Sequence, residues 1–550
     1  MFASESARGA RVTRRMLLRV LALGATAFTA CGPASAPAAP AGVPTAPATS
    51  PPTIVSPTPT TLVVASANPT PVSAPPRRSG GTLRVAALAE PPNLDGFIQL
   101  AIIRDQLWPM FDKLIDVDQN AVVQPRLAER WEFAPDYKQL TLHLRQGVMF
   151  HSGREMTSAD VKWNLDRTHD STAGNGNLPP LFAFVKDVQT PDPRTVVLSF
   201  DQAKPAAFDI LNFMNVLDPR ADAKQQPVGT GPFIFAEWSS GDHLRLIKNP
   251  NYWEVGKPAL DEIVFRFIKD PQAMVTALEA GAVDLVDPVP TTDAVRLRND
   301  PKYQVLVSSN PSAISILGVN VITSPFEKKE VRQALNFALN RQRMVDVALS
   351  GFGEPRVLPW PTTSIAYDAG KAATYPFDLE RARTLLGNAG VSAFNAELTF
   401  PTNTPEYAQM GQIFQADLAN IGITLTLKPL DAAAWNNYVV QTTTWGLSFA
   451  GAPPVNLHPS SVLSRVWTSP TNNINNFRDP AWTDLAARVA AEGDPAKLKA
   501  LSVELDDYLL DQSWFIPVTS APPKVAALAN VGGIAFDAND SPTLRNAQLS

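Results

Sequence analysis

The sequence predicts an α/β fold, because two segments, residues 263–286 and 398–427, each alternate strand, helix and strand. In the first segment Ile263, Phe265 and Phe267 stand at every second position, the period of a strand with one buried face. A proline then stands where it can open a helix, and an apolar run returns as a second strand. Short units of this kind favour parallel strands joined by right-handed crossovers.

The second segment follows the same plan. Its first strand is Leu398–Phe400, and Gly422 ends the helical stretch that follows. Beyond that glycine, Ile423, Leu425 and Leu427 alternate as in a strand. The apolar residues on one face of the helical stretch are Met410, Ile413, Phe414 and Leu418.

The remaining folded sequence carries mixed strand and helix signals. Thr157 and Asp160 have the spacing of a capping box at the start of a helix. No repeat of 20–50 residues is visible, which argues against solenoids and propellers. Further predicted strands are 80–88, 140–144 and 195–200, and further predicted helices are 327–349 and 378–389.

Composition limits the classes of function. The chain has 550 residues, a net charge of -5 and a pI near 5.7, so nothing indicates binding to nucleic acid. The single cysteine, Cys31, excludes a disulfide framework within the chain.

Residues 1–30 have the plan of an export signal. Arginines precede an apolar run, residues 20–30, that is about half the length of a membrane-spanning helix. The small residues before Cys31 resemble a lipobox, although Phe28 stands where Leu, Val or Ile is usual. We therefore expect Cys31 to be lipidated, with ordinary secretion as the alternative. Arg14 and Arg15 also resemble a twin-arginine export motif, with a generic basic region as the alternative.

Residues 31–79 are rich in Pro, Ala, Thr and Ser, and they contain no aromatic or acidic residue. Such a composition cannot bury a core. We expect an extended tether between the lipidated cysteine and the folded chain, which begins at residue 80.

Several motifs resemble the family-5 extracellular solute-binding proteins of ABC transporters, which include oligopeptide, dipeptide and nickel receptors. They occur in the order typical of that family and extend over much of the chain from residue 80 onward. The motifs are 80–86 with 90–95, 125–131, 142–153, 157–162, 228–233, 249–258, 277–284, 331–335 and 381–386.

The resemblance implies a periplasmic-binding-protein-like fold of type II (cluster C), with two hinged lobes and an extra inserted domain. Mapped onto this chain, lobe I comprises 80–117, 226–311 and 516–550, the inserted domain 118–225, and lobe II 312–515. The resemblance further implies a monomer outside the cytoplasm, anchored to the membrane, that binds a small solute in the interlobe cleft. It would deliver this solute to a permease with its ATPases, without a cofactor and without enzymatic activity.

The family's peptide receptors bind the α-amine of a peptide with an aspartate in a segment that corresponds here to residues 445–458. That stretch contains no acid. We therefore expect a peptide held by its backbone or a neutral, polyhydroxylated solute such as an oligosaccharide, unless Asp431 or another acid supplies the contact. The candidate ligand-binding residues are Trp360, Phe449, Trp445, Asn456, His458 and Asn93, which offer aromatic faces and hydrogen bonds.

Three other classes of protein are alternatives. A secreted hydrolase lacks support, because neither a Gly-x-Ser-x-Gly elbow nor a His-Glu-x-x-His motif occurs. A metal receptor is disfavoured by five scattered histidines, of which only His143 and His151 could meet across a turn. A sensor or adhesion lipoprotein that kept the fold without its transporter is the third alternative.

Overall fold

The computed structural model describes residues 80–550, apart from 99–100, 171–181, 312, 453–456 and 464–465. The predicted signal peptide, Cys31 and the tether lie outside the described residues.

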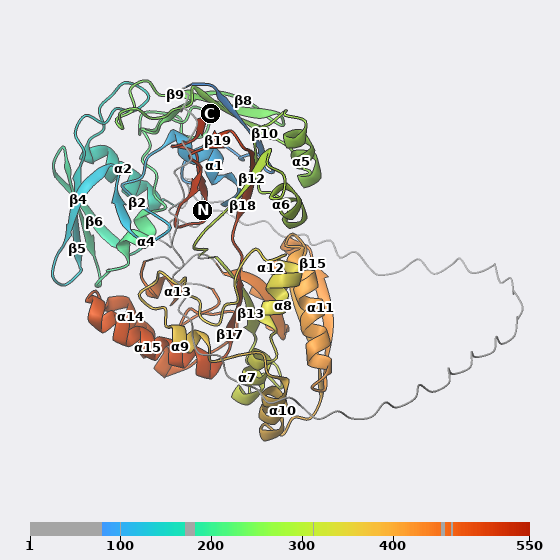
Figure 1. The fold of residues 1–550 in the computed structure, drawn as a ribbon. Helices are drawn as coiled ribbons and strands as arrows, with labels where there is room; N and C mark the ends of the chain where they lie inside the picture. Colours follow the sequence, from blue (N-terminus) through green and yellow to red (C-terminus); the bar gives the residue numbers. More distant parts are fainter. Residues whose placement is uncertain (1–79, 99–100, 171–181, 312, 453–456, 464–465) are drawn as a thin grey trace, which may run out of the picture. The chain divides into compact units, whose positions relative to one another are not determined.

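A seven-stranded sheet forms around β1, which pairs in parallel with β10 and with β11 (Figure 1). Helix α5 (Pro271–Glu279) joins β10 to β11, and this confirms the first predicted strand–helix–strand unit. The side chain of Asp270 caps α5 by accepting a hydrogen bond from the backbone of Ala273 (2.7 Å), with Pro271 as the first helical residue. In spatial order the strands are β12 (Tyr303–Val307), β18 (Lys524–Leu528), β11 (Leu285–Asp287), β1 (Thr82–Ala87), β10 (Glu262–Phe267), β9 (His243–Lys248) and β8 (Phe233–Ser239).

A five-stranded sheet forms from the later part of the chain. Its strand β14 pairs in parallel with β15 and with β16, and α11 (Glu406–Ala419) is the crossover between β14 and β15. The four apolar residues predicted for one face of this helix are all buried, so the second unit is also confirmed. The spatial order is β15 (Ile423–Leu430), β14 (Phe394–Pro401), β16 (Leu447–Ala452), β13 (Ile314–Val319) and β17 (Phe515–Ser520).

A four-stranded antiparallel sheet lies within the range predicted for the inserted domain. Helix α2 (Ser158–Thr168) packs against it and begins with the predicted capping box, in which Thr157 N–H donates to the Asp160 carboxylate (2.8 Å). The strands, in spatial order, are β4 (Ala128–Phe133), β5 (Gln139–Leu144), β7 (Thr195–Phe200) and β6 (Val185–Asp192).

Strands β1 and β13, inside the two larger sheets, contribute to hydrophobic clusters on both faces, as expected for the inner strands of such sheets. On β1, Val85 belongs to one hydrophobic cluster and Ala86 to the cluster on the other side. On β13, Leu317 and Ile316 likewise belong to two different hydrophobic clusters, one on each face of the sheet.

One long helix predicted over residues 327–349 is interrupted. It is replaced by α7 (Lys329–Phe337), α8 (Arg341–Arg343) and a π-helical turn, η4 (Met344–Ala348). The reason is local, because the side chain of Asn340 accepts a hydrogen bond from the backbone of Arg343 (3.1 Å) and so caps a new helical start.

Other segments connect and cover the sheets, and α14 and α15 lie side by side (Figure 1). Their bounds are η1 (Ala101–Ile103), α1 (Arg104–Leu107), η2 (Trp108–Met110), β2 (Ile115–Val117), β3 (Val123–Pro125), α4 (Ala207–Leu211), α6 (Thr291–Leu297), α9 (Ala369–Ala372), α10 (Leu379–Asn388), α12 (Ala432–Gln441), α13 (Ser460–Leu463), α14 (Pro480–Ala491), α15 (Pro495–Gln512), β19 (Val531–Gly532), β20 (Ala535–Phe536), β21 (Pro542–Thr543) and β22 (Gln548–Leu549).

The chain passes from the seven-stranded to the five-stranded sheet after β12 and returns after β17. The two connections are hydrogen-bonded to the neighbouring segments, through Ser308 N–H to Pro523 O (3.2 Å) and Ala521 N–H to Ala313 O (3.1 Å). The lobe boundary expected between residues 515 and 516 falls inside β17, which pairs with β13 in the five-stranded sheet. The chain therefore returns to the seven-stranded sheet only after Ser520. The other domain boundaries stay predictions.

Candidate functional site

The carboxyl ends of the parallel strands mark a place in each large sheet where ligands usually bind. The chain crosses over β1 when it passes from β10 to β11, and it crosses over β14 when it passes from β15 to β16. Connections then leave the central strand on opposite sides, and open α/β sheets bind their ligands in the crevice at such points.

These two edges lie against each other. Helix α6 follows β11 and α11 follows β14, so the first residues of both helices stand at the carboxyl edges. Thr291, the first residue of α6, donates a hydrogen bond from its hydroxyl to the carboxylate of Glu406, the first residue of α11 (3.0 Å). The candidate site therefore lies where the seven-stranded and five-stranded sheets meet.

Two carboxylates at this place were not among the site residues predicted from the sequence. Asp287 is the last residue of β11, and Asp105 lies on the short helix α1 with 6% of its surface exposed. Burial raises the pKa of Asp105 well above its usual value, and the neighbouring Asp287 raises it further. Burial also raises the pKa of Asp287, to about 7. Within the described part of the chain, the only charged group that acts on Asp105 is Asp287, which carries the same sign.

This pair predicts an unusual pH dependence of stability. In the unfolded chain both acids ionise near pH 4, whereas in the folded chain they keep their protons longer, Asp287 up to about pH 7. The folded state therefore binds more protons, and its free energy of unfolding should fall as the pH rises from about 4 to about 7. Asp287→Asn should reduce this slope and raise the melting temperature at pH 8, as measured by thermal unfolding across that range. An unchanged slope would contradict the assignment.

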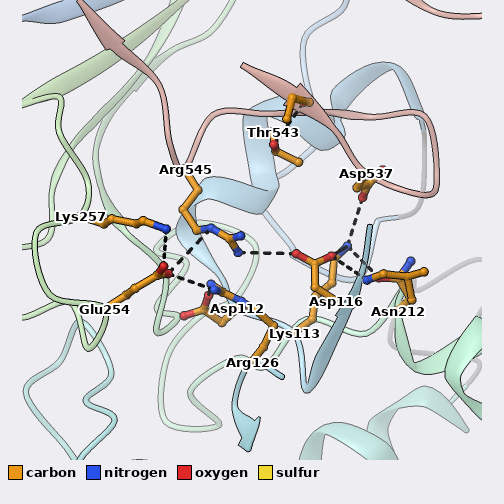
Figure 2. A network of polar contacts seen from close by, with 12 residues as sticks. Asp112, Lys113, Asp116, Arg126, Asn212, Glu254, Lys257, Asp537, Thr543 and Arg545 are labelled. Carbon is orange, nitrogen blue, oxygen red and sulfur yellow. Dashed lines mark hydrogen bonds and ion pairs between the residues drawn. The ribbon is translucent and has the colours of Figure 1, made fainter. Parts of the chain in front are cut away.

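Asp105 also lines a cavity of about 70 Å³ beneath the C-terminal segment. Ion pairs surround this cavity (Figure 2), with Lys113 paired to Asp537 (3.3 Å) and Arg545 to Asp116 (3.5 Å). Its other lining residues include Trp108, Phe111, Asp112, Arg126, Asn215 and Leu544.

Arg126 stands at the centre of this network. Its guanidinium contacts Asp112 (2.5 Å) and Glu254 (3.0 Å), and the carbon of the guanidinium lies 4.8 Å from the ring centroid of Trp253. Burial lowers the pKa of Arg126, but the carboxylates of Asp112 and Asp116 outweigh it, so the net pKa lies above its usual range. This network is structural, since its charges are paired with one another.

Three aromatic candidates lie in the interior. Trp360, Trp445 and Phe449 have 0% exposed surface. The indole N–H of Trp360 donates to the Asp506 carboxylate (2.6 Å), and Trp445 packs edge-on against Trp467 (5.9 Å between centroids). Each is covered by neighbouring side chains, as large apolar groups usually are. Contact with ligand would require those side chains to move, and it stays a prediction.

Phe449 packs against the start of α11, at the carboxyl edge of the five-stranded sheet. It belongs to β16, and its ring centroid lies 5.9 Å from that of Tyr407, the second residue of α11. Burial raises the pKa of Tyr407 to about 12, so its phenol stays protonated.

The polar candidates are engaged in local contacts. The His458 ring lies between Ser460 Oγ (2.8 Å) and the Glu492 carbonyl oxygen (2.9 Å), and burial lowers its pKa. Asn93 accepts a hydrogen bond from the backbone of Asp95 (3.0 Å), and Asn456 lies outside the described residues.

The acid considered as a substitute, Asp431, caps α12. Its Oδ1 accepts hydrogen bonds from the backbone N–H groups of Ala433 (3.0 Å) and Ala434 (2.9 Å), and the residue is exposed.

The described residues give no support for a metal receptor. Among them, no group of three or more His, Cys, Asp or Glu side chains could hold a metal ion. His143 contacts Glu132 (3.0 Å) and His151 contacts the Gly231 carbonyl oxygen (3.0 Å), so the two rings have separate partners. Within the same part of the chain, no helix combines the length and apolar character that crossing a membrane requires.

Comparisons with known proteins show the family to which this chain belongs. The family model of the bacterial extracellular solute-binding proteins, family 5 (middle), matches residues 122–474. The glutathione-binding protein GsiB of Shigella dysenteriae is 28% identical over 429 residues, which cover 74% of this chain and 82% of the relative. These relatives are substrate-binding proteins and not enzymes.

Solved structures of binding proteins share the fold. The binding protein AgaA from A. tumefaciens R10, in complex with agropinic acid, is 27% identical, with a TM-score of 0.68 over 86% of this chain and 99% of its own. The ABC transporter substrate-binding protein CtaP from Listeria monocytogenes has a TM-score of 0.77 at 20% identity, over 86% and 100% of the two chains. The predicted α/β binding-protein fold is confirmed, and this chain belongs to the family-5 bacterial extracellular solute-binding proteins.

Proposed function

We propose that this chain is the substrate-binding lipoprotein of an ABC importer, and that it captures a peptide or a similar small organic solute. The solute would lie between the carboxyl edges of the two larger sheets. The observation that carries this proposal is the contact of the two edges through Thr291 and Glu406, beside the two connections of the chain. Two lobes joined by such connections can close around a ligand, as in other binding proteins of this type.

The chemical class of the solute follows from the relatives. GsiB is named as a glutathione-binding protein, and a dipeptide-binding protein from Pseudoalteromonas sp. SM9913 was solved with Met-Leu; it is 21% identical, with a TM-score of 0.72 over 86% of this chain and 100% of its own. Both named ligands are short peptides with a free amine. The polar groups at the meeting edges, Asp105, Asp287, Glu406 and Thr291, suit a solute of this size and polarity better than an apolar one.

The location and the partners complete the proposal. Lipidation of Cys31 would anchor the chain outside the cytoplasm, and residues 32–79 would form the tether. The closed, solute-loaded form would then dock on a permease, whose ATPases drive import.

One preparation of the purified chain can test both the lipid anchor and the receptor function. The wild-type chain should partition into the detergent phase, and Cys31→Ser should move it to the aqueous phase or leave it unprocessed.

Solute released from the purified, denatured chain should be peptide-like by mass spectrometry. Added back at 100 times its dissociation constant, it should stabilise the fold by about 2.7 kcal/mol. If the chain releases only oligosaccharide, the peptide assignment is wrong. If it releases nothing and no peptide or oligosaccharide raises its melting temperature, the receptor function is wrong.

A further inference from the structure

Helix α4 is hydrogen-bonded to a segment that follows β16, far away in the sequence. The carboxylate of Asp209, on α4, accepts hydrogen bonds from the backbone N–H groups of Leu457 (2.9 Å) and His458 (3.0 Å), which lie 248 and 249 residues further along the chain. Each oxygen of the carboxylate accepts from one of the two N–H groups. The side chain of Leu457 packs against the hydrophobic cluster that includes β5 and β7 of the four-stranded sheet. The contact therefore has a polar and an apolar part.

A second contact lies at the turn between β4 and β5. The hydroxyl of Tyr137 donates a hydrogen bond to the carbonyl oxygen of Gly493 (3.0 Å), in the connection between α14 and α15 (Figure 1). A Cβ at Gly493 would lie 2.2 Å from carbons of the Tyr137 ring, so only glycine allows the ring to come this close. Tyr137 itself has a φ of 55°, a left-handed conformation that is unusual for a bulky residue. Such strain is found mainly at functional positions, where the surrounding structure maintains it.

Each side of these two contacts is held together by its own packing. The ring of Phe133, on β4, packs against Phe208 of α4 (5.4 Å between centroids) and against Tyr137 (5.3 Å). On the other side, a ring nitrogen of His458 lies 2.9 Å from the carbonyl oxygen of Glu492, one residue before the glycine. Because both partners on each side are linked in this way, we expect the two contacts to form and break together.

The nature of the contacts suits a junction that opens. Asp209, Tyr137 and Gly493 are partly exposed, so water can replace their hydrogen bonds when the two sides separate. A permanent junction between domains is usually large and hydrophobic, whereas this one centres on a carboxylate and a phenol.

We propose that these contacts form a latch, which holds the four-stranded sheet against the segments before α13 and between α14 and α15 in the closed form of the receptor. The latch residues are Asp209, Tyr137, Leu457, His458 and Gly493. The inference rests on the proposed function, because closure around a solute brings distant parts of a receptor together, and a contact made only in the closed form stabilises that form. A carboxylate that accepts two N–H groups makes a strong, charge-assisted contact. Asp209 and Tyr137 are therefore positioning residues, which set the residence time of the solute by holding the closed form.

The rate of solute dissociation from the purified full-length chain tests the latch, with glutathione and Met-Leu as probes. Asp209→Asn replaces one of the two acceptor oxygens by an N–H donor group. We therefore expect either peptide to dissociate about tenfold faster, with little change in its association rate. Gly493→Ala should act in the same direction, because the new Cβ displaces the tyrosine ring. Asp222→Asn is the matched control, since its carboxylate also accepts two backbone N–H groups, from Lys224 (2.9 Å) and Gln225 (3.3 Å), but within its own turn.

Hydrogen exchange measures the same contact without solute. The backbone N–H groups of Leu457 and His458 should exchange about tenfold faster in Asp209→Asn than in the wild type and in Asp222→Asn. Equal exchange in all three chains would overturn the latch. Faster exchange with unchanged dissociation rates would also overturn it, because the contact would then be structural only, while the receptor function would stand.

A milder variant separates the latch from a damaged fold. Tyr137→Phe removes only one hydroxyl, so it should speed dissociation to a smaller extent at an unchanged melting temperature. Unchanged dissociation rates in both Tyr137→Phe and Gly493→Ala would contradict the proposal.

If neither peptide binds, the proposed function fails, and X-ray scattering of the free chain decides the latch separately. The radius of gyration of Asp209→Asn should exceed that of the wild type and of Asp222→Asn, because the two sides of the broken latch move apart. Equal radii of all three chains would overturn the latch.

Discussion

Asp112→Ala should lower the free energy of unfolding by about 4 kcal/mol, because it leaves the buried guanidinium of Arg126 without its main partner. Asp112 is 3% exposed and accepts four hydrogen bonds. The donors are Arg126 (2.5 Å), Tyr252 (2.9 Å), Trp253 (2.8 Å) and Thr230 (3.3 Å). Urea unfolding followed by tryptophan fluorescence would measure the change.

An exposed ion pair provides the control for this prediction. Arg130 and Glu132 are paired at 3.3 Å with both side chains 64% exposed, so Glu132→Ala should cost less than about 1 kcal/mol. Asp112→Asn should fall between the two, because the amide keeps the shape and one acceptor. A loss below 1 kcal/mol for Asp112→Ala would show that the network does not hold this part of the fold.

Gly231→Ala should destabilise the chain by about 3 kcal/mol, at the upper end of the usual cost of overpacking. A Cβ at this position would lie 2.5 Å from the Met110 carbonyl carbon and 2.5 Å from the Phe111 nitrogen. Both are backbone atoms beside the cavity, and they cannot move aside as a flexible side chain could. Gly229 meets the same obstacle, with the Met110 oxygen 2.2 Å from its Cβ position.

Gly387 offers the matched comparison. It lies exposed in α10 with nothing within 4 Å of its Cβ position, so Gly387→Ala should stabilise the chain by up to about 1 kcal/mol. Thermal and urea unfolding of both variants would measure the difference. Equal stability of Gly231→Ala and wild type would mean that the segment around Met110 is free to shift.

Local patterns predicted much of the secondary structure, because their causes lie within a few residues. The capping box at Thr157 and the helix start at Pro271 need no distant partner, and both occur as expected. At Gly229 and Gly231, by contrast, the backbone lies close to Met110 and Phe111, residues far away in the sequence. The motif residue Trp253 donates a hydrogen bond to Asp112 and packs over the guanidinium of Arg126.

The binding residues were harder to predict. Aromatic side chains occur both in hydrophobic cores and in ligand clefts, so the sequence could not tell which of them are buried. In the structure, Trp360, Trp445 and Phe449 are buried by neighbouring residues. The family resemblance places an acid among residues 445–458, whereas Asp105 and Asp287 lie outside that segment.

By itself the sequence determined the α/β plan, the family and several helix starts, because period, capping and motif order are written along the chain. Only the tertiary structure decided where the acids lie. Asp105 on α1 and Asp287 at the end of β11 stand far apart in the sequence, and only the folded chain brings them close enough for Asp287 to affect the pKa of Asp105. Their raised pKa values come from burial and from each other, and both causes exist only once the chain has folded.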